Sequence, residues 1–214
     1  MNPPRISLQL VLDVLSQRHQ ISFVKRGDGE EACMNGEPGG NCDGHPYTPE
    51  LGLKLREAFD FLASKPNVYI SRFEDQTEYN TFLHRTDNNL QSLHDFYLGI
   101  RNLGRRKVFV GPQRLVRAAM MLRAEFVTVP LVNAYDSYDE IARACRWRST
   151  PNTLMMFCCG MPAKPLIADM FKFRDGSELS CLDLGSAFDP VFVGQTRTVQ
   201  AAQRDLLALY SDLL

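Results

Sequence analysis

The sequence predicts a single α/β domain over residues 1–214: a Rossmann-like, mostly parallel sheet with helices on both faces. Two observations support this prediction. Short, almost uninterrupted apolar runs alternate along the chain with segments of helical periodicity, a pattern typical of parallel strands covered on both sides. The chain also has the size and composition of one globular domain, with 214 residues, 44% of them hydrophobic and 23% charged.

The first half of the chain alternates helices and strands around one long loop. Apolar residues at helical spacing predict the helices, and Thr48 with Pro49 gives the second helix an N-cap and a first-turn proline. A stretch rich in Gly, Asn, Asp and Pro predicts the loop. In chain order we expect a helix at 6–18, a strand at 21–25, a loop at 31–49, a helix from 49, a strand at 68–71 and a helix at 89–103.

The second half is more regular. Each expected strand is an apolar run that ends at a glycine or an asparagine, and each is followed by a segment of helical periodicity. We expect strands at 107–110, 126–132, 153–159 and 179–184, and helices at 113–124, 137–146, 162–173 and 197–213.

Bulk properties exclude several classes of protein. A net charge of −1 provides no overall basic field for nucleic acid or for anionic membranes, although a local basic groove stays possible. The first residues lack the apolar run of a signal peptide, and no apolar run approaches the roughly 18 residues of a membrane span. Adjacent Cys158 and Cys159 in an apolar run indicate buried free thiols. We therefore expect a cytoplasmic protein without a membrane partner.

An acidic, glycine-rich stretch follows the first predicted strand. Asp28 and Glu30 are two residues apart, so in locally extended backbone their side chains would project to the same side. Two such carboxylates form a hard oxygen site suited to Mn²⁺ or Mg²⁺. Gly27 and Gly29 would let a ligand approach the backbone, and Arg26 could bind a phosphate bidentately. The alternative is an ordinary surface turn.

Polar residues or glycines follow the other predicted strands as well. Ligands of open α/β sheets bind beyond the carboxyl ends of the strands, so this coincidence predicts a binding site there. The turn Gly160–Ala163 either presents backbone N–H groups to a phosphate or only begins a helix. Neither a G-x-G-x-x-G fingerprint nor a phosphate-binding P-loop is present, which argues against NAD enzymes and P-loop kinases. The strand-end positions are Asp28, Arg72, Gly111, Asn133, Gly160 and the segment 183–189.

Other motifs leave alternatives open. The segment Asn41–His45 is a zinc site, a polar active-site loop or a structural turn. Basic groups at 105–107 and 143–148 are solvated helix ends or phosphate contacts. Arg197 either lies over a phosphate or belongs to a helix start.

Taken in order, four motifs resemble those of the GT-D type glycosyltransferases, over roughly residues 21–190. The first resembles the Asp-x-Glu motif of that family, the second its Asn-Ala-Phe/Tyr segment, the third its Leu-Gly-Pro-Thr-Ala segment and the fourth its closing Asp-x-Gly. In this sequence they are Arg26–Glu30, Asn133–Ile141, Cys159–Ala168 and Leu182–Gly185.

The resemblance implies a metal-dependent hexosyltransferase that uses a nucleotide-sugar donor, expected to be a UDP-sugar. Asp28 and Glu30 would hold Mn²⁺ or Mg²⁺ at the departing diphosphate, and Asp43 or Asp189 is a candidate to accept the proton of the acceptor hydroxyl. The acceptor is a glycan on protein or a hydroxymethylated pyrimidine in DNA. The candidate donor-binding residues are Arg26, Gly27, Gly29, Arg72, Asn133, Gly160, Pro162, Asp183, Gly185 and Arg197.

Two other functions remain open from the sequence. One is a non-catalytic nucleotide- or phosphate-binding module of the same fold. The other is an S-adenosylmethionine-dependent methyltransferase, suggested by the strand-end acidic residue in Leu182–Ser186.

Overall fold

The structure, a computed structural model, describes residues 7–17, 20–41, 44–72, 90–174 and 179–189, and it is these residues that are discussed below. They form a six-stranded sheet in the order β2-β1-β6-β5-β3-β4, and every strand pair is parallel. The predicted α/β class is therefore confirmed. The strands are β1 (Ser22–Arg26), β2 (Val68–Arg72), β3 (Lys107–Pro112), β4 (Glu125–Val129), β5 (Thr153–Phe157) and β6 (Leu179–Asp183).

Helices connect the strands close to where the sequence predicts them. No helix in the described part of the chain combines the length and the apolar character that a membrane crossing requires. The helix expected at 197–213 lies outside the described residues. The helices are α1 (Leu8–Ser16), α2 (Asp28–Met34), α3 (Pro49–Ala63), α5 (Leu90–Asn102), α6 (Val116–Met121), α7 (Tyr138–Arg148) and α8 (Ala163–Arg174), with short 3₁₀ turns η2 (Gln113–Leu115) and η3 (Ala134–Ser137).

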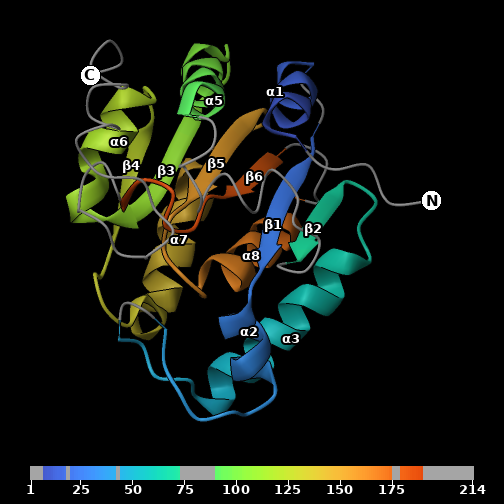
Figure 1. Cartoon of the computed structure of the whole chain (residues 1–214), viewed down its shortest axis with the longest axis vertical. Coiled ribbons are helices and arrows are strands. Elements are labelled where there is room, and N and C mark those ends of the chain that lie inside the picture. Colours follow the sequence, from blue (N-terminus) through green and yellow to red (C-terminus); the bar gives the residue numbers. More distant parts are fainter. Residues whose placement is uncertain (1–6, 18–19, 42–43, 73–89, 175–178, 190–214) are drawn as a thin grey trace.

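The helices cover the two faces of the sheet as separate layers. Helices α3, α7 and α8 pack on one face, and α1, α5 and α6 on the other (Figure 1). Right-handed crossovers explain this division, because the connections that step in one direction along the sheet place their helices on the same face. The chain after β6 departs from its neighbours: Leu184, Ala187 and Phe188 pack in the α1/α5/α6 layer. The end of β6 is thus flanked by chain leaving toward opposite faces, as at ligand sites of α/β sheets.

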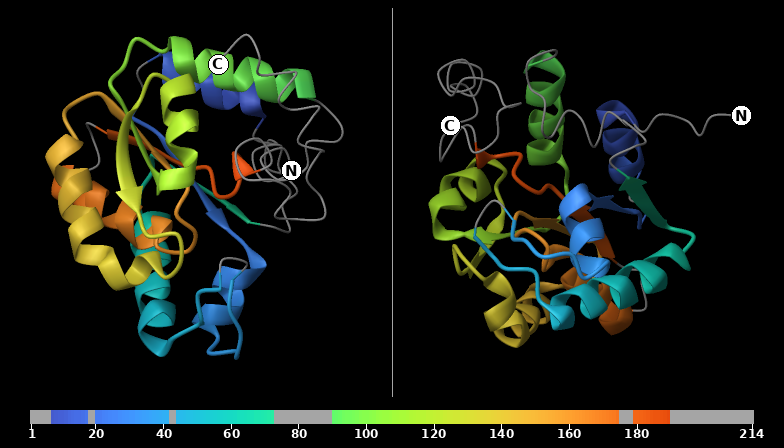
Figure 2. Two further views of the ribbon diagram at one scale, coloured as in Figure 1. Left: turned by 90° about the vertical axis from the view of Figure 1, so that its left-hand side faces the viewer. Right: turned by 60° about the horizontal axis from the view of Figure 1, so that its bottom comes forward.

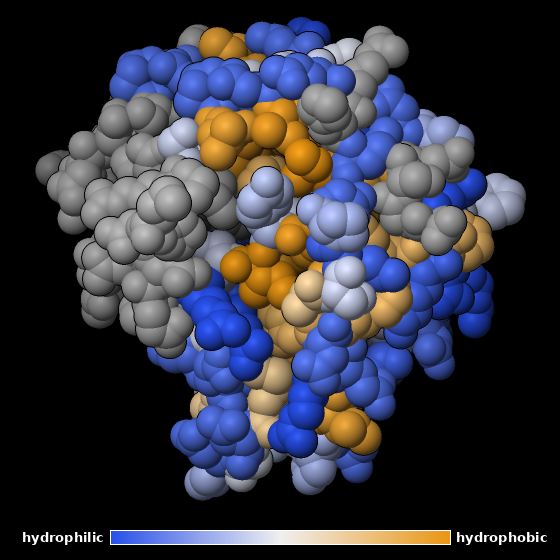
Figure 3. All heavy atoms as spheres, turned by 90° about the vertical axis from the view of Figure 1, so that its right-hand side faces the viewer, coloured by the Kyte–Doolittle hydropathy of each residue, from blue (hydrophilic) through white to orange (hydrophobic). Residues whose placement is uncertain are grey.

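The two edges of the sheet are β2 and β4. Along β2 the exposed Tyr69 stacks on Phe23, with ring centroids 5.4 Å apart. The face that contains this edge carries apolar patches set among hydrophilic residues (Figure 3). A short edge strand that ends in the exposed Arg72 limits pairing with another chain.

Residues 28–34 are helical, so the predicted extended turn at Asp28 and Glu30 is wrong. Residues two apart on a helix point about 200° apart around its axis and do not share a face. Gly27 is the N-cap, and its N–H donates to Oε2 of Glu30 at 3.1 Å. A Cβ at position 27 would lie 2.9 Å from that same oxygen, so glycine leaves room for the carboxylate to fold back.

Packing against α3 holds α2 in place, and α2 with the described parts of the following loop stands out from the sheet (Figure 2). A Cβ at Gly52 of α3 would lie 2.5 Å from the carbonyl oxygen of Cys33 in α2. The backbones of these two helices therefore approach as closely as a glycine allows. The position of Glu30 depends on this contact, because α2 carries it.

Candidate active site

A lysine links two carboxylates at the carboxyl ends of β1 and β6. Lys164 Nζ, from the first turn of α8, lies 2.6 Å from Glu30 Oε1 and 3.0 Å from Asp183 Oδ2. The three side chains are 5%, 13% and 0% exposed, respectively. Buried charges are stable only when they are paired and hydrogen-bonded, as these are. We call these three residues the ionic cluster.

The pKa values of the cluster reflect this mutual pairing. Burial alone would raise the pKa of Glu30, but the charge of Lys164 and hydrogen bonds from Lys164 and Gly27 outweigh it and lower that pKa. Burial alone would lower the pKa of Lys164, but the two carboxylates raise it. Both groups are therefore ionised at neutral pH, and the cluster is a fixed arrangement of charges.

Asp183 is held at both of its oxygens. Oδ2 also accepts from the backbone N–H of Lys25 at 3.2 Å, and Oδ1 accepts from Gly185 N–H at 3.2 Å. The side chain of Lys25 is buried as well, and its Nζ donates to the carbonyl of Leu184 at 3.3 Å. Asp183 therefore ties β1 to the turn after β6. We expected Asp183 and Gly185 to contact the donor; Asp183 is instead enclosed by protein groups.

The predicted proton acceptor Asp189 follows β6 and lies at the same end of the sheet as the ionic cluster. Its side chain is 11% exposed, and Oδ2 is 3.9 Å from a guanidinium nitrogen of Arg114 in η2, just after β3. Burial, followed by the charge of Asp189, raises the pKa of the Cys158 thiol, which places that carboxylate near the end of β5. Asp43, the other candidate, lies outside the described residues, as does Arg197.

The residues at the rim are more exposed. Arg26 pairs with Glu31 through two hydrogen bonds of 2.5 and 3.0 Å and lies 5.0 Å from the ring centroid of Phe59. Arg26 therefore already holds a carboxylate at the position where we expected it to bind phosphate. Asp28 is exposed, and its Oδ1 accepts from Gly29 N–H at 2.9 Å. Arg72 pairs in register with Arg26 on the neighbouring strand.

The turn between β5 and α8 adopts the geometry of a helix start. Gly160 has a φ of +67°, which favours glycine, and Pro162 is buried in the following turn. The N–H groups of Ala163 and Lys164 donate to the carbonyls of Gly160 and Met161. The turn therefore uses these two N–H groups internally, and its main contribution to the site is the position of Lys164.

A loop brings a second group of residues to this end of the sheet. Residues 39–47 close on themselves through an antiparallel bridge between Gly40 and Pro46. A Cβ at Gly29 would lie 3.1 Å from both Tyr47 Oη and Met161 Cε, so Tyr47 from the loop and Met161 from the β5–α8 turn both approach α2 there. The ring of the buried His45 lies 6.4 Å from that of Tyr135, next to Ala134 and the predicted donor residue Asn133.

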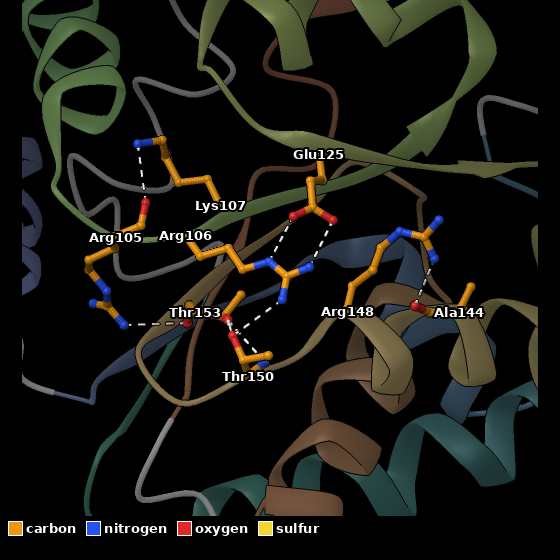
Figure 4. A network of polar contacts seen from close by, with 8 residues as sticks. All are labelled: Arg105, Arg106, Lys107, Glu125, Ala144, Arg148, Thr150 and Thr153. Carbon is orange, nitrogen blue, oxygen red and sulfur yellow. Dashed lines mark hydrogen bonds and ion pairs between the residues drawn. The ribbon is translucent and has the colours of Figure 1, made fainter.

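The basic residues 105–107 lie at the amino end of β3, at the opposite end of the sheet from this site. Figure 4 shows their polar contacts. Arg106 forms two hydrogen bonds with Glu125, and Arg105 donates to Thr153 O and Ser180 Oγ. Lys107 Nζ donates to backbone carbonyls at the end of α5. These groups join the starts of β3, β4, β5 and β6, so their role is structural.

Within the described part of the chain, no three His, Cys, Asp or Glu side chains gather into a metal-binding group. Of the predicted zinc site at 41–45, residues 42 and 43 lie outside the described residues. The absence of such a group among the described residues leaves Asp28 and Glu30 as two separate carboxylates, one exposed and one paired with Lys164.

Sequence reasoning missed Lys164, Arg114 and Tyr47. A signal for Lys164 exists: it is the one charged residue in the otherwise apolar stretch 161–168, which the predicted packing of α8 buries. A buried lysine requires a carboxylate partner, and the strand-end acids Glu30 and Asp183 were the available candidates.

Comparison with known proteins supports the fold. Searches against protein-family models and curated proteins found no match. Two similar solved structures belong to domain of unknown function 1792, one described as having a distinct glycosyltransferase fold and the other substituted with selenomethionine. Each matches this protein with a TM-score of 0.63 and 19% sequence identity. Each match covers 92% of this chain and 84% of the neighbour's own chain. At this identity the likeness concerns the fold: the chain has a glycosyltransferase-like α/β fold, and the ionic cluster lies at the carboxyl ends of its strands.

Proposed function

We propose that the protein is a glycosyltransferase of the GT-D type that moves a sugar from a nucleotide-sugar donor, a UDP-sugar, to a hydroxyl group. The single observation that carries the proposal is the buried cluster of Glu30, Lys164 and Asp183 at the carboxyl ends of β1 and β6. Its three residues fall in three of the four motifs that resemble the GT-D family, and it lies on a sheet like that of the glycosyltransferase-fold neighbours.

Glycosyl transfer separates charge, because the diphosphate leaves as positive charge builds on the anomeric carbon. Fixed cations near the leaving group lower the barrier without reorganising during the reaction. Arg114 supplies such a charge at the rim, whereas the charge of Lys164 is offset by its two carboxylate partners. In the proposed reaction Asp189 accepts the proton of the acceptor hydroxyl, since it is a partly enclosed carboxylate beside Arg114.

One of the two predicted metal ligands, Asp28, fits the binding of Mn²⁺ or Mg²⁺. Asp28 offers an exposed carboxylate, and these ions are often held by one or two carboxylates together with substrate phosphates. Glu30 would have to share Oε1 with Lys164. We therefore propose that Asp28 is the main protein ligand and that Glu30 is secondary. Such an ion supplies Lewis acidity to the departing diphosphate.

The chemistry of the reaction indicates only the class of the acceptor, which is a hydroxyl group. A hydroxyl on a protein-linked glycan and a hydroxymethylated pyrimidine in DNA both fit the reaction. DNA would require a local basic surface, because the net charge of the chain is −1.

A panel of UDP-, GDP- and ADP-sugars, monitored for nucleoside diphosphate release with and without hydroxymethylated DNA, tests the function. We expect slow release from a UDP-sugar alone and faster release with the right acceptor. Asp28→Asn should weaken Mn²⁺ binding in the presence of UDP, measured by electron paramagnetic resonance, whereas Asp60→Asn, an exposed acid on α3, should not. Nucleotide binding without any donor consumption would favour a non-catalytic module instead.

A further inference from the structure

Asn133 has a buried side-chain oxygen that no described residue satisfies. It is the N-cap of η3, yet its side chain forms no capping hydrogen bond. An asparagine at an N-cap normally accepts from a backbone N–H of the following turn. Its Oδ1 is buried and accepts no hydrogen bond from any residue that the structure describes. Leaving a buried acceptor unpaired is unfavourable, so such an atom calls for a ligand or another explanation.

Backbone conformation alone does not explain Asn133. Its φ of +53° is one that asparagine tolerates better than most residues, and Asn152 has a comparable φ of +64°. Asn152 also has an unpaired Oδ1, but it lies just before β5, at the amino ends of the strands, opposite to the candidate site. Asn133 follows β4, at the end where ligands of such sheets bind. Asn133 and Asn152 therefore share a positive φ and an unpaired Oδ1, and they differ in which end of the sheet they occupy.

The surroundings of Asn133 suit a flat heterocycle. Leu131 and Val132 precede it with side chains 50% and 49% exposed, although they are aliphatic. The half-buried ring of Tyr135 follows, 5.7 Å from that of Tyr138. Apolar and aromatic surfaces beside a single amide group provide faces for stacking and an edge for hydrogen bonding.

The position relative to the ionic cluster matches the dimensions of a nucleotide. In the sheet, β4 lies two strands from β5 and three from β6. At the usual spacing this places the end of β4 roughly 10–15 Å from the ends of those strands. Two residues of the described segment 44–47 link the two regions, since Tyr47 approaches Gly29 and the ring of His45 lies 6.4 Å from that of Tyr135.

We propose that Asn133 reads the base of the donor, with Oδ1 accepting the N3–H of uracil and Nδ2 donating to a uracil carbonyl oxygen. This inference rests on the proposed function, because it assigns the nucleotide of the same donor. A carboxamide is complementary to this edge of uracil. With the base held in this pose, cytosine would place the lone pair of N3 opposite Oδ1, so the proposed contact favours uracil.

Calorimetric titration of UDP and CDP tests the inference in wild type, Asn133→Asp and Asn133→Gly. Wild type should prefer UDP by about tenfold, the discrimination typical of a bidentate base contact. Aspartate keeps an acceptor but loses the donor, and glycine keeps the left-handed backbone but has no side chain. Asn133→Gly should therefore reduce the preference to less than about threefold, whereas Asn133→Asp, which keeps the acceptor for N3–H, should retain a preference for UDP. The ratio is the readout, because the added charge of aspartate weakens both diphosphates alike.

The matched control is Asn152→Asp, which should leave both affinities and their ratio unchanged. A preference for UDP that survives in Asn133→Gly overturns the inference, and so does a wild type that binds UDP and CDP equally. Either result leaves the transferase function intact. If the wild-type protein binds no nucleoside diphosphate at all, the proposed function fails together with the inference.

Discussion

Replacing Lys164 with methionine removes the ammonium group that Glu30 and Asp183 share, while it keeps most of the side-chain volume. Breaking a buried ion pair by removing one partner typically destabilises a protein by about 3–5 kcal/mol. Glu30 retains the hydrogen bond from Gly27 N–H, and Asp183 retains those from Lys25 N–H and Gly185 N–H. We therefore expect the lower end, about 3 kcal/mol, which is a large part of a typical stability of about 5–15 kcal/mol.

The loss should depend on pH, with a sign fixed by the pKa shift of Glu30. In the wild type this pKa is lowered, so the stabilisation is present above the unfolded value of about 4.3 and is lost as the pH falls through the folded value. In Lys164→Met, burial is no longer offset and the pKa of Glu30 rises, so the carboxyl group becomes neutral at a higher pH. The difference in unfolding free energy between wild type and variant should shrink between pH 6 and pH 4.

Urea unfolding followed by far-UV circular dichroism measures this difference, because the sole tryptophan, Trp147, is 85% exposed and reports poorly on folding. Lys172→Met, on the exposed side of the same helix, is the matched control and should cost less than about 1 kcal/mol. Glu30→Gln should be milder than Lys164→Met, since Lys164 keeps Asp183. A loss below 1 kcal/mol, or one that is constant from pH 4 to pH 8, would refute the buried cluster.

Two further predictions concern the fold. Gly52→Ala should destabilise the protein by about 1–3 kcal/mol despite alanine's higher helix propensity, because the new Cβ meets the Cys33 carbonyl; Gly104→Ala, in open space, should change the melting temperature little. Arg105→Ala should cost about 2 kcal/mol by removing buried charged hydrogen bonds, whereas Arg106→Ala, in an exposed pair, should cost under 1 kcal/mol in urea unfolding. Equal losses for the two arginine variants would contradict this assignment.

The layered α/β fold could be predicted from the sequence because its strands are buried on both faces and so read as apolar runs. β5 and β6 are buried at every position, and α3 begins at the predicted Thr48 and Pro49. Helix α2 was not predicted, since two glycines and an aspartate within three residues favour a turn in isolation. Its close packing on α3 through Gly52 overrides that local preference, and no pattern within residues 27–34 reports a contact with residue 52.

The location of the candidate site could be predicted from the sequence, but the contacts between its side chains could not. Strand-end residues gather because parallel strands end at one edge, and Glu30 and Asp183 do meet there. Their shared partner Lys164 is 19 positions before Asp183 and 134 after Glu30, so only the register of the sheet and the start of α8 bring the three together. The same limit applies to Asn133, whose unpaired amide is visible only once the surrounding side chains are placed.

The charge balance of the buried groups determines what the rim must supply. Lys25 and Lys164 carry two positive charges, and Glu30 and Asp183 carry two negative ones, so these four side chains are neutral together. A diphosphate arriving above them finds no excess positive charge below. The negative charge of the diphosphate must be neutralised by partly exposed side chains at the rim, such as Arg114, or by an ion that enters with the donor at Asp28. Donor affinity should therefore respond more strongly to changes at the rim, whereas changes in the buried groups should act first on folding.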